Sequence, residues 1–394
     1  MQTIILAAGR GTRMGPLTES LPKPMLPVAG RPLVGHTIDA VAAAGATRIV
    51  LVVGYESEAI EAYLDDDPAD VPVSVVHQSE QRGTGDAVRR AVPHLDPDPF
   101  VVLNGDALYD HASLRALYGA GPAVGSYRVP NPGAYGVLRT DGDRVTGVTE
   151  KPADPPSNLI NTGAYVFPAA ARGWLDVGES ERGEIELTDA LQRACEETTV
   201  STVRFERWLD VGRPWELLAA NEWKLADLDG RLDGDVSADA HLDGPVVVEP
   251  GATIRPGAVV DGPAYVGADA TVGPNAYVRG ATMLGPGAKV GHGVEVKNSV
   301  VMSDASVGHL SYVGDSVLGR GVNFGAGTNV ANLRHDDDTV RVTVKGTRTD
   351  TGRRKFGVVC GPGAKTGINT ALNAGVTLSA GATTAPGAVV TRDR

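Results

Sequence analysis

The stretch VEPGATIRPGAVVDGPAYVGADATVGPNAYV, residues 248–278, places an apolar residue at every sixth position. Gly, Pro and Ala fill many of the positions between these residues. A period this short and strict is typical of a stacked β-solenoid, in which the apolar residue points inward and a turn follows each short strand. A disordered Gly/Pro/Ala-rich tail is the alternative, but it does not explain the regular spacing.

The period continues downstream and then fails at one place. The whole series is Val248, Ile254, Val260, Val266, Val272, Val278, Leu284, Val290, Val296 and Met302. The next position is Gly308, and His309 follows it directly in SVGHLSYVGD, residues 306–315. After a charge-rich insertion at about residues 333–357, the period resumes at Cys360, Thr366, Leu372, Leu378, Thr384 and Val390. The solenoid therefore continues nearly to residue 394, with an irregular region beside a histidine.

Residues 1–230 have a different texture. Four short apolar runs read as buried strands: TIILAAG (3–9), RIVLVVG (48–54), VSVVHQ (73–78) and FVVLNGD (100–106). Helical spacing separates them, for example in residues 33–45, and residues 214–228 form a further predicted helix. This alternation predicts an α/β domain with a parallel sheet and helices on both faces. We place the boundary at about residue 230, which gives domains 1–230 and 231–394.

Composition limits the function. The formal net charge is −12, which argues against a general nucleic-acid partner because such proteins need a basic surface. No apolar run approaches the ~18 residues of a membrane span, so we expect no membrane partner. The start MQTIILAAG has no basic region, so we expect no secretory signal. The two cysteines form no disulfide or zinc pattern, which fits the cytoplasm.

The most specific stretch is LAAGRGTRMGPLTESLPKPMLPVAGRP, residues 6–32. Its glycines allow backbone N–H groups to approach an anionic ligand closely, and Arg13 and Lys23 add two positive charges. No Gly-Lys-Ser/Thr follows, so it is not a Walker A loop, and its spacing is not the dinucleotide fingerprint either. Ligands of such folds lie at the carboxyl ends of the strands, where the motifs HQSEQRGTGDA, VLNGD, LINTGAYVF and WLDVGRPWE also occur.

With these motifs, the first 225 residues resemble the nucleotidylyltransferases that make NDP-sugars from a sugar 1-phosphate and an NTP. The resemblance implies a Rossmann-like domain in which Arg13 and Lys23 are catalytic and Asp106 and Asp210 hold Mg²⁺. Taken singly, each aspartate would more often be a strand-end or turn residue. The implied nucleotide contacts are Leu6, Ala8, Gly9, Gly11, Thr12, Gln78, Gly83 and Thr84. The implied sugar-phosphate contacts are Asn104, Gly136, Glu150, Lys151 and Asn161.

Physical chemistry agrees with this assignment. The sugar phosphate oxygen that attacks the α-phosphorus is already ionised, so catalysis reduces to positioning and neutralising crowded anions. Two hard carboxylates suit Mg²⁺, and two cations suit the departing pyrophosphate. Asn104 and Asp210 are closer to glucose-1-phosphate thymidylyl- and uridylyltransferases than to the N-acetylglucosamine-1-phosphate type, which leaves UTP or dTTP, and the preferred sugar, open.

The irregular region, residues 297–338, resembles the acetyltransferase half of bifunctional glucosamine-1-phosphate acetyltransferase/N-acetylglucosamine-1-phosphate uridylyltransferases. Hexapeptide repeats of this kind imply a left-handed parallel β-helix, three hexads to a coil, and a homotrimer. The implied base is His309, whose unperturbed pKa near 6.5 suits removal of a proton from an amino sugar. The implied substrate contacts are Arg279, Lys297, Tyr312, Asn323 and Asn332, with Ala326 contacting acetyl-CoA.

The contacts to the CoA phosphates are open. Arg341, Lys345, Arg353 and Arg354 are candidates, and a charged surface loop is an equal alternative. The preferred function is a two-headed enzyme that acetylates glucosamine 1-phosphate and then transfers a uridylyl group from UTP. Two alternatives remain: a single-activity nucleotidylyltransferase with a structural or regulatory β-helix, and a catalytically silent, ligand-sensing subunit. The sequence leaves the sugar substrate open among glucosamine, galactosamine and glucose 1-phosphates.

Overall fold

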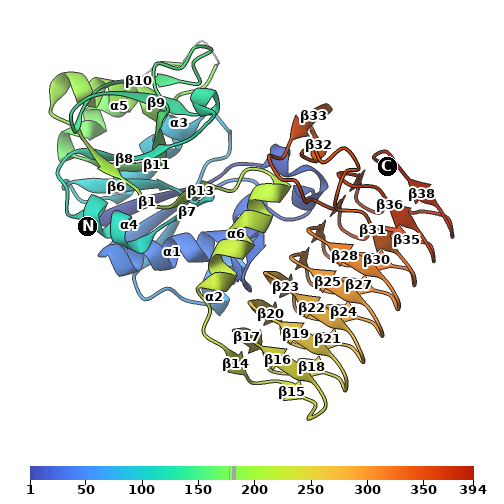
Figure 1. The fold of residues 1–394 in the computed structure, drawn as a ribbon. Coiled ribbons are helices and arrows are strands. Elements are labelled where there is room, and N and C mark those ends of the chain that lie inside the picture. The colour runs from blue at the N-terminus through green and yellow to red at the C-terminus, as the bar shows by residue number, and fades with distance from the viewer. Residues whose placement is uncertain (177, 180–182) are drawn as a thin grey trace. The chain divides into compact units, whose positions relative to one another are not determined.

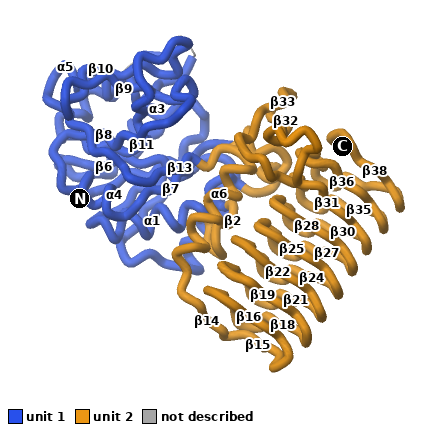
Figure 2. Tube along the Cα trace, in the orientation of Figure 1, with its two compact units in different colours: residues 1–10, 22–25, 33–210 blue, residues 11–21, 26–32, 211–394 orange. Residues whose placement is uncertain are grey.

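The structure is a computed structural model and describes residues 1–176, 178–179 and 183–394. The chain divides into two compact units (Figure 2). The first contains residues 1–10, 22–25 and 33–210, and the second contains residues 11–21, 26–32 and 211–394. N-terminal segments thus alternate between the units, and the single boundary near residue 230 stays a prediction. No helix in the described ranges combines the length and apolar character that a membrane crossing requires.

A nine-stranded sheet forms the centre of the first unit (Figure 1). Its order is β5 (Val73–His77), β4 (Arg48–Val53), β1 (Gln2–Ala7), β6 (Phe100–Asn104), β11 (Leu159–Phe167), β8 (Ala123–Arg128), β12 (Ser201–Arg204), β10 (Arg144–Glu150) and β9 (Gly136–Asp141). The four strands expected from the sequence are adjacent and parallel. Beyond them the sheet is mixed, because β11 is antiparallel to both β6 and β8. The expectation of a parallel sheet therefore holds throughout for β5, β4, β1 and β6, and in the rest of the sheet only for the pair of β8 and β12.

Helices cover both faces of this sheet, as predicted. Ile5 of β1 shares a buried cluster with α1 (Leu33–Ala44), α2 (Ser57–Asp66) and α4 (His111–Tyr118). Its neighbour Ile4 faces the other way, toward α3 (Thr84–Ala91) and α5 (Leu187–Glu197). Successive side chains of a strand point to opposite faces, so one apolar run serves both clusters.

The second unit contains the predicted left-handed parallel β-helix (Figure 1), built from three parallel sheets. Sheet I consists of β14 (Arg231–Leu232), β17 (Val246–Val248), β20 (Ala264–Val266), β23 (Thr282–Leu284), β26 (Val300–Val301), β29 (Val317–Leu318), β34 (Val359–Cys360) and β37 (Thr377–Leu378). Sheet II consists of β15 (Asp235–Val236), β18 (Thr253–Ile254), β21 (Thr271–Val272), β24 (Lys289–Val290), β27 (Ser306–Val307), β30 (Asn323–Phe324) and β35 (Lys365–Thr366). Sheet III consists of β16 (His241–Asp243), β19 (Val259–Asp261), β22 (Tyr277–Arg279), β25 (Glu295–Lys297), β28 (Tyr312–Gly314), β31 (Asn329–Val330), β36 (Ala371–Leu372) and β38 (Val389–Val390).

The predicted inward series is correct to Val296 and wrong at the next member. Leu284 pairs with Val301, not with Met302, so the inward position moves one residue forward. Val307 then takes the inward place that the regular count assigns to Gly308. The physical reason is a corner one residue shorter, which recurs between Val313 and Leu318. The repeat therefore changes phase before His309 rather than failing at it.

Sheet I is covered on its outer side as well. The helix α6 (Pro214–Ala226) packs against β23, and the outward residues Met283, Val300 and Val317 are buried. The segment 26–32 also lies there, since a Cβ on Gly30 would be 2.3 Å from the Tyr265 ring. The predicted insertion forms a hairpin of β32 (Arg341–Val344) and β33 (Thr347–Asp350). The outer side of sheet I is therefore apolar and covered along these coils.

Candidate active sites

One cluster in the first unit joins residues that are far apart in the chain. Asp106 follows β6, and Asp210 ends β13 (Trp208–Asp210), which pairs with β7 (Ala107–Tyr109) so that Asp210 lies opposite Ala107. The buried Lys23 extends its Nζ to 2.7 Å from Asp106 Oδ2 and 3.8 Å from Asp210 Oδ1. The two carboxylates are therefore close enough to share one cation.

This carboxylate pair fits the predicted Mg²⁺. Mg²⁺ is commonly held by one or two carboxylates, with substrate phosphates and waters as the other ligands. The described residues contain no group of three or more His, Cys, Asp or Glu that could hold a metal ion, so a site here would rely on Asp106 and Asp210. Lys23 Nζ contacts one oxygen of each carboxylate and supplies positive charge to the pair in this structure.

A cavity of about 480 Å³ lies at the carboxyl ends of β4 and β5, lined by Arg10, Gly54, Tyr55, Gln78, Ser79, Glu80 and Gln81. The predicted base-reading residue Gln78 is buried, and its Nε2 donates to Gly83 O and Asp86 Oδ2. Gln81 Nε2 donates to Ala8 O at 2.9 Å, which ties the cavity to the end of β1. Leu6 and Ala8 are buried and Gly9 is exposed. Of the predicted nucleotide residues in this unit, Gln78 lines the cavity, and Gly83 and Ala8 accept hydrogen bonds from the lining residues Gln78 and Gln81.

Asp86 is a functional candidate that the sequence analysis missed. Its buried carboxylate accepts hydrogen bonds from Gln78, Arg89 and Arg90. Burial alone would raise the pKa of Asp86, but these three hydrogen bonds outweigh it and lower the pKa below its usual value. Asp86 therefore holds Gln78 in one orientation. The available signal was an acidic residue in the first turn of the helix that begins at Thr84, whose Oγ1 accepts from Leu187 N–H.

The predicted sugar contacts form a second group in this unit. A Cβ on Gly136 would lie 2.2 Å from Asn161 Nδ2 and 2.9 Å from Glu150 Oε2, so these three residues are together. A Cβ on Gly163 would lie 2.2 Å from Asn104 Nδ2. Asn161 Oδ1 accepts from Gly163 N–H and from Tyr165 Oη, which fixes the amide. The turn after Asn161 therefore connects the Asn104 side chain with the Gly136 group.

Lys151 lies at the sugar group, and part of the glycine-rich loop belongs to the second unit. Lys151 is half exposed, with its Nζ 3.5 Å from Glu150 Oε1. Gly11, Thr12 and Arg13 belong to the second unit, at the start of the 3₁₀ segment Thr12–Thr18. That segment lies beside β34, since a Cβ on Gly361 would be 2.7 Å from Pro16. Arg13 therefore belongs to a different unit from Lys23, Asp106 and Asp210.

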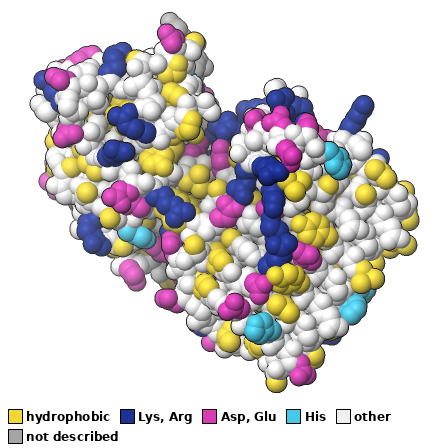
Figure 3. All heavy atoms as spheres, viewed as in Figure 1, with side chains coloured by type: hydrophobic (Ala, Val, Ile, Leu, Met, Phe, Trp, Pro, Cys, Tyr) yellow, Lys and Arg dark blue, Asp and Glu magenta, His cyan; other side chains and the backbone are white. Residues whose placement is uncertain are grey.

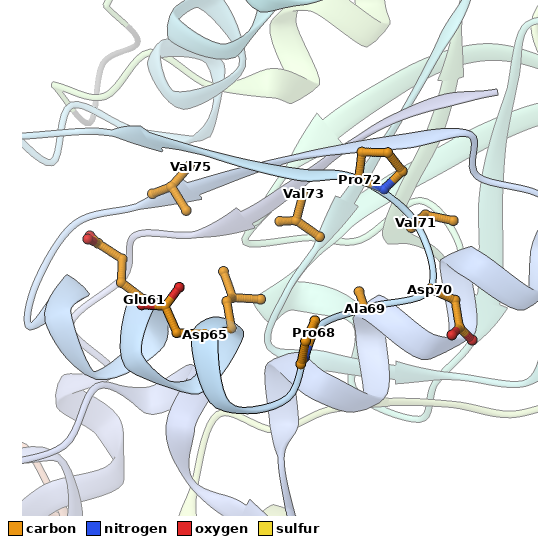
Figure 4. Close-up of a pocket in the computed structure, with 10 residues that line it drawn as sticks. Glu61, Asp65, Pro68, Ala69, Asp70, Val71, Pro72, Val73 and Val75 are labelled. Atoms are coloured by element: carbon orange, nitrogen blue, oxygen red, sulfur yellow. The ribbon is translucent and has the colours of Figure 1, made fainter.

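Figure 4 shows a different cavity in the first unit, of about 660 Å³, between α2 and the edge strand β5. Val73 and Val75 form part of its wall, and the carboxylates of Glu61, Asp65 and Asp70 lie around it. None of the predicted site residues lines this cavity. It lies along the strand and the preceding loop, away from the strand end that carries Gln78, and we assign it no role.

In the β-helix, two predicted substrate residues contact one carboxylate, and a third, Tyr312, is bonded to one of them. Lys297 Nζ and Asn332 Nδ2 donate to Asp315 Oδ2 at 2.7 and 2.6 Å, and Asn332 Nδ2 also donates to Tyr312 Oη at 3.2 Å. Asp315 is itself buried. Arg279 pairs with Lys297 in the sheet register but forms its own ion pair with Glu295. Asp315 was not among the predicted residues.

The pKa of Tyr312 is raised above its usual value, first by burial and then by the negative charges of Glu295 and Asp315. Its hydroxyl therefore stays protonated and can donate to a substrate oxygen. Figure 3 shows basic side chains in a column on this face of the second unit, with acidic side chains beside them. The register of sheet III accounts for such a column, because Asp261, Arg279 and Lys297 occupy one position in three successive coils.

His309 lies in an exposed turn between sheets II and III. Its Nδ1 accepts a hydrogen bond of 3.1 Å from His292 N–H, so the neutral ring carries its proton on Nε2. Ala326 lies on the next coil at the same corner, since a Cβ on Gly308 would be 2.8 Å from Ala326 N. Asn323 is on sheet II, whereas Lys297 and Tyr312 are on sheet III. One chain thus distributes the predicted residues over two faces of the β-helix.

The insertion borders a cavity of about 340 Å³, lined by Leu333, Arg334, His335, Asp336, Val340, Arg341, Arg348, Asn373 and Ala374. Of the four predicted CoA-phosphate candidates, only Arg341 lines it. Arg353 is paired with Glu222 of α6, and Arg354 with Asp337. Arg348, which the sequence analysis did not name, lines the cavity and donates to Gly375 O at 3.1 Å.

The comparisons with known proteins agree with two functional halves. The nucleotidyl transferase family matches residues 2–226, and the GMPPB C-terminal domain matches residues 260–356. The "Bifunctional protein GlmU" of Methanococcus maripaludis is 39% identical, across 100% of this chain and 95% of that protein. The "Bifunctional sugar-1-phosphate nucleotidylyltransferase/acetyltransferase" of Sulfurisphaera tokodaii is 38% identical, across 100% and 98%.

Two further comparisons concern the N-terminal half. The "UTP--glucose-1-phosphate uridylyltransferase AglF" of Haloferax volcanii is 38% identical, across 54% of this chain and 92% of that protein. A crystal structure of UDP-glucose pyrophosphorylase complexed with UDP-glucose superposes with a TM-score of 0.53 at 25% identity, across 58% of this chain and 99% of that chain.

Proposed function

We propose that this chain, which belongs to the nucleotidyl transferase family and within it to the bifunctional sugar-1-phosphate nucleotidylyltransferase/acetyltransferases, makes UDP-N-acetylglucosamine from glucosamine 1-phosphate in two reactions. The β-helix acetylates glucosamine 1-phosphate with acetyl-CoA, and the N-terminal domain then transfers a uridylyl group from UTP. The observation that carries the proposal is that each half contains its own polar cluster: Lys23 with two aspartates in one, and Lys297 with Tyr312 and Asn332 in the other.

In the nucleotidyl reaction, the phosphate oxygen of the sugar attacks the α-phosphorus of UTP, and pyrophosphate leaves. Asp106 and Asp210 would hold Mg²⁺, which when bound supplies positive charge to the phosphates. Lys23 neutralises the pyrophosphate, and Arg13 keeps the catalytic role that the resemblance implies. Gln78 reads the base in the cavity at the strand ends, and Gly136, Glu150 and Asn161 bind the sugar. Because Gly136 has no side chain, it leaves space next to Asn161 and Glu150 that a Cβ would fill.

In the acetyl reaction, the substrate ammonium first loses a proton to His309. The imidazolium passes this proton to solvent, and the free amine attacks the thioester carbonyl of acetyl-CoA while His309 accepts a second proton from the same nitrogen. The carbon–sulfur bond then breaks, and the CoA thiolate receives this second proton from the imidazolium. Because Nδ1 holds the lone pair of the ring, His309 must release the His292 N–H bond before it accepts a proton there. Its exposure in a turn gives the ring room to do so.

The separation of residues over two faces supports a homotrimer built through the β-helix. Asn323 on sheet II of one chain would then complete a site with Lys297 and Tyr312 on sheet III of another. Arg341 and Arg348, which line the insertion cavity, are our candidates for the CoA phosphates, because neither forms an ion pair with a carboxylate in the described part of the chain.

A second candidate substrate for the N-terminal half is glucose 1-phosphate. The similarity to AglF over this half favours it, as do Asn104 and Asp210. A panel of glucosamine, galactosamine, glucose and N-acetylglucosamine 1-phosphates, each with UTP and dTTP, separates these substrates by the rate of pyrophosphate release.

The main experiment measures two products, free CoA thiol and pyrophosphate, for the wild type and two variants. We expect His309→Ala to lower thiol release by about 10²–10⁴-fold, the usual range for a lost general base, and to leave pyrophosphate release unchanged. Asp106→Asn should show the reverse. A wild type that releases pyrophosphate but no thiol would make the chain a single-activity nucleotidylyltransferase.

The thiol assay suits this protein. Cys195 and Cys360 are both free, and burial raises the pKa of each thiol. Their reaction with a thiol reagent is therefore slow in the folded protein. Free cysteines also support the predicted cytoplasmic location.

A further inference from the structure

We propose that Asp315 is a positioning residue of the acetyltransferase site, acting through Lys297 and Asn332. The inference deepens the proposed acetyl transfer and rests on it. Lys297 and Asn332 both donate to one oxygen of the Asp315 carboxylate, at 2.7 and 2.6 Å. The side chain of Asp315 is 3% exposed, and that of Lys297 is 17% exposed. A buried carboxylate with two such donors fixes where both of them point.

The effect on Asn332 is an orientation. Its Nδ2 donates to both Asp315 Oδ2 and Tyr312 Oη, so both amide hydrogens are used. Within the described residues, Asn332 Oδ1 has no partner. The arrangement therefore presents an acceptor oxygen to the substrate, which suits an amine or a hydroxyl. An amide turned over by half a rotation would instead present a donor there.

The effect on Lys297 is a fixed position. One of its three N–H groups is held by Asp315, and the other two are available to an anion such as the sugar phosphate. Without the carboxylate, a flexible four-carbon side chain would have to be ordered by the substrate itself, at the cost of its rotamer entropy.

The second oxygen of Asp315 is held as well. Asp315 Oδ1 accepts from Asn298 Nδ2 at 2.9 Å, and Asn298 Nδ2 also donates to Glu222 Oε1 at 2.8 Å. Glu222 is paired with Arg353 at the end of the insertion. With partners on both oxygens, the carboxylate cannot rotate freely. Helix α6 and the insertion therefore both support the position of Asp315.

The fold allows this residue to be changed without breaking its turn. Asp315 has φ = +49°, and Asn298 and Gly280 take φ = +46° and +63° at the same corner of the two preceding coils. Asp, Asn and Gly are the residues that tolerate this left-handed conformation best. Asp315→Asn and Asp315→Gly are therefore both compatible with the corner, and each removes the charge.

The experiment is a double-mutant cycle on the full-length protein. We measure thiol release with glucosamine 1-phosphate and acetyl-CoA for Asp315→Asn, Asn332→Ala and the double variant. Asp315→Asn should raise KM for glucosamine 1-phosphate by about 10–100-fold, the usual cost of misplaced groups near a site. KM for acetyl-CoA and the rate of pyrophosphate release should change less than about twofold. If Asp315 acts through Asn332, the double variant should release thiol no more than about threefold more slowly than the poorer single variant.

Asp304→Asn is the matched control. Asp304 also has a left-handed backbone, with φ = +58°, but it lies at another corner of the β-helix and is exposed. We expect wild-type kinetics for it. If Asp315→Asn loses pyrophosphate release or melts early, Asp315→Gly replaces it in the same cycle.

The outcomes are distinct. An active wild type with an unchanged KM in both Asp315 variants would overturn the inference alone. Losses that multiply with Asn332→Ala, and multiply again in a second cycle with Lys297→Ala, would also overturn it, because they would mean an effect independent of both residues. A wild type that acetylates none of the amino sugar phosphates would overturn the proposed function and this inference together.

Discussion

Replacing Lys23 by Met should destabilise the protein in the absence of metal, and Mg²⁺ should reverse the effect. Lys23 is the cation that the carboxylates of Asp106 and Asp210 share, and its side chain is 5% exposed. Met has a similar shape and no charge, so the variant fills the space but leaves two carboxylates together without a counter-ion. A divalent cation can then take the place of the missing ammonium.

The distances set the size of the effect. At an effective dielectric constant of about 20, ion pairs at 2.7 and 3.8 Å attract by about 6 and 4 kcal/mol before desolvation is subtracted. Breaking a fully buried pair costs about 3–5 kcal/mol. The Asp106 side chain is 35% exposed, so solvent screens it, and we expect a net loss of about 2 kcal/mol. Mg²⁺ at about one hundred times its Kd would return about 2.7 kcal/mol.

The assay is urea denaturation of the full chain with EDTA or with Mg²⁺, following the transition that Mg²⁺ displaces. Lys151→Met is the control, because the half-exposed Lys151 should contribute less than about 1 kcal/mol. Lys23 already neutralises part of the carboxylate charge in the wild type, so Mg²⁺ should stabilise Lys23→Met more than the wild type. Equal stabilisation of the two proteins, or a variant as stable as the wild type in EDTA, would refute the reasoning.

Three other predictions follow from the same sites. Gly136→Ala should lower kcat/KM for uridylyl transfer by more than about tenfold and spare thiol release, because its Cβ would lie 2.2 Å from Asn161 Nδ2. Asp86→Asn should cost about 1–3 kcal/mol at pH 7. Because the pKa of Asp86 is lowered on folding, that difference from the wild type should shrink as the pH falls below about 4, which urea titrations across pH would measure. Changing Arg341 and Arg348 together to Ala should raise KM for acetyl-CoA about tenfold or more in the thiol assay and leave pyrophosphate release unchanged.

Much of the fold was predictable because its period is strong. Runs such as RIVLVVG and FVVLNGD are apolar on both faces of the strand. This pattern is typical of strands in a sheet that is covered on both sides. The antiparallel pairings of that sheet were not predictable from such runs, because an apolar run does not show which strands β11 pairs with or in which direction. In the β-helix, the count of six could not choose between Val301 and Met302, since both are apolar. Only the pairing of Leu284 with Val301 decides it.

The sites were predictable where a motif marks a strand end. The motifs VLNGD and WLDVG pointed to Asp106 and Asp210 as strand-end carboxylates. Lys23 is far from both aspartates in the sequence, and only the structure shows that it contacts them. Asp86 and Asp315 were missed for a shared reason. Each is an acidic residue next to a turn or helix start, where a solvated side chain is the ordinary expectation, and only the fold shows that each is buried against several donors.

The irregularity in the repeat is connected with the chemistry through Asp315 more directly than through His309. In the regular coil, Gly280 occupies the corner between sheets III and I and offers no side chain. In the next two coils that corner is one residue shorter, and the buried Ser299 and Ser316 bond to its backbone: Ser299 Oγ donates to Lys297 O and accepts from Ser316 N–H. Asn298 and then Asp315 take the place of the glycine. Asn298 donates to Asp315, and Asp315 accepts from Lys297 and Asn332. A strict hexad repeat can build the scaffold, but the shortened corners are what bring a buried carboxylate to the residues that we assign to the sugar phosphate.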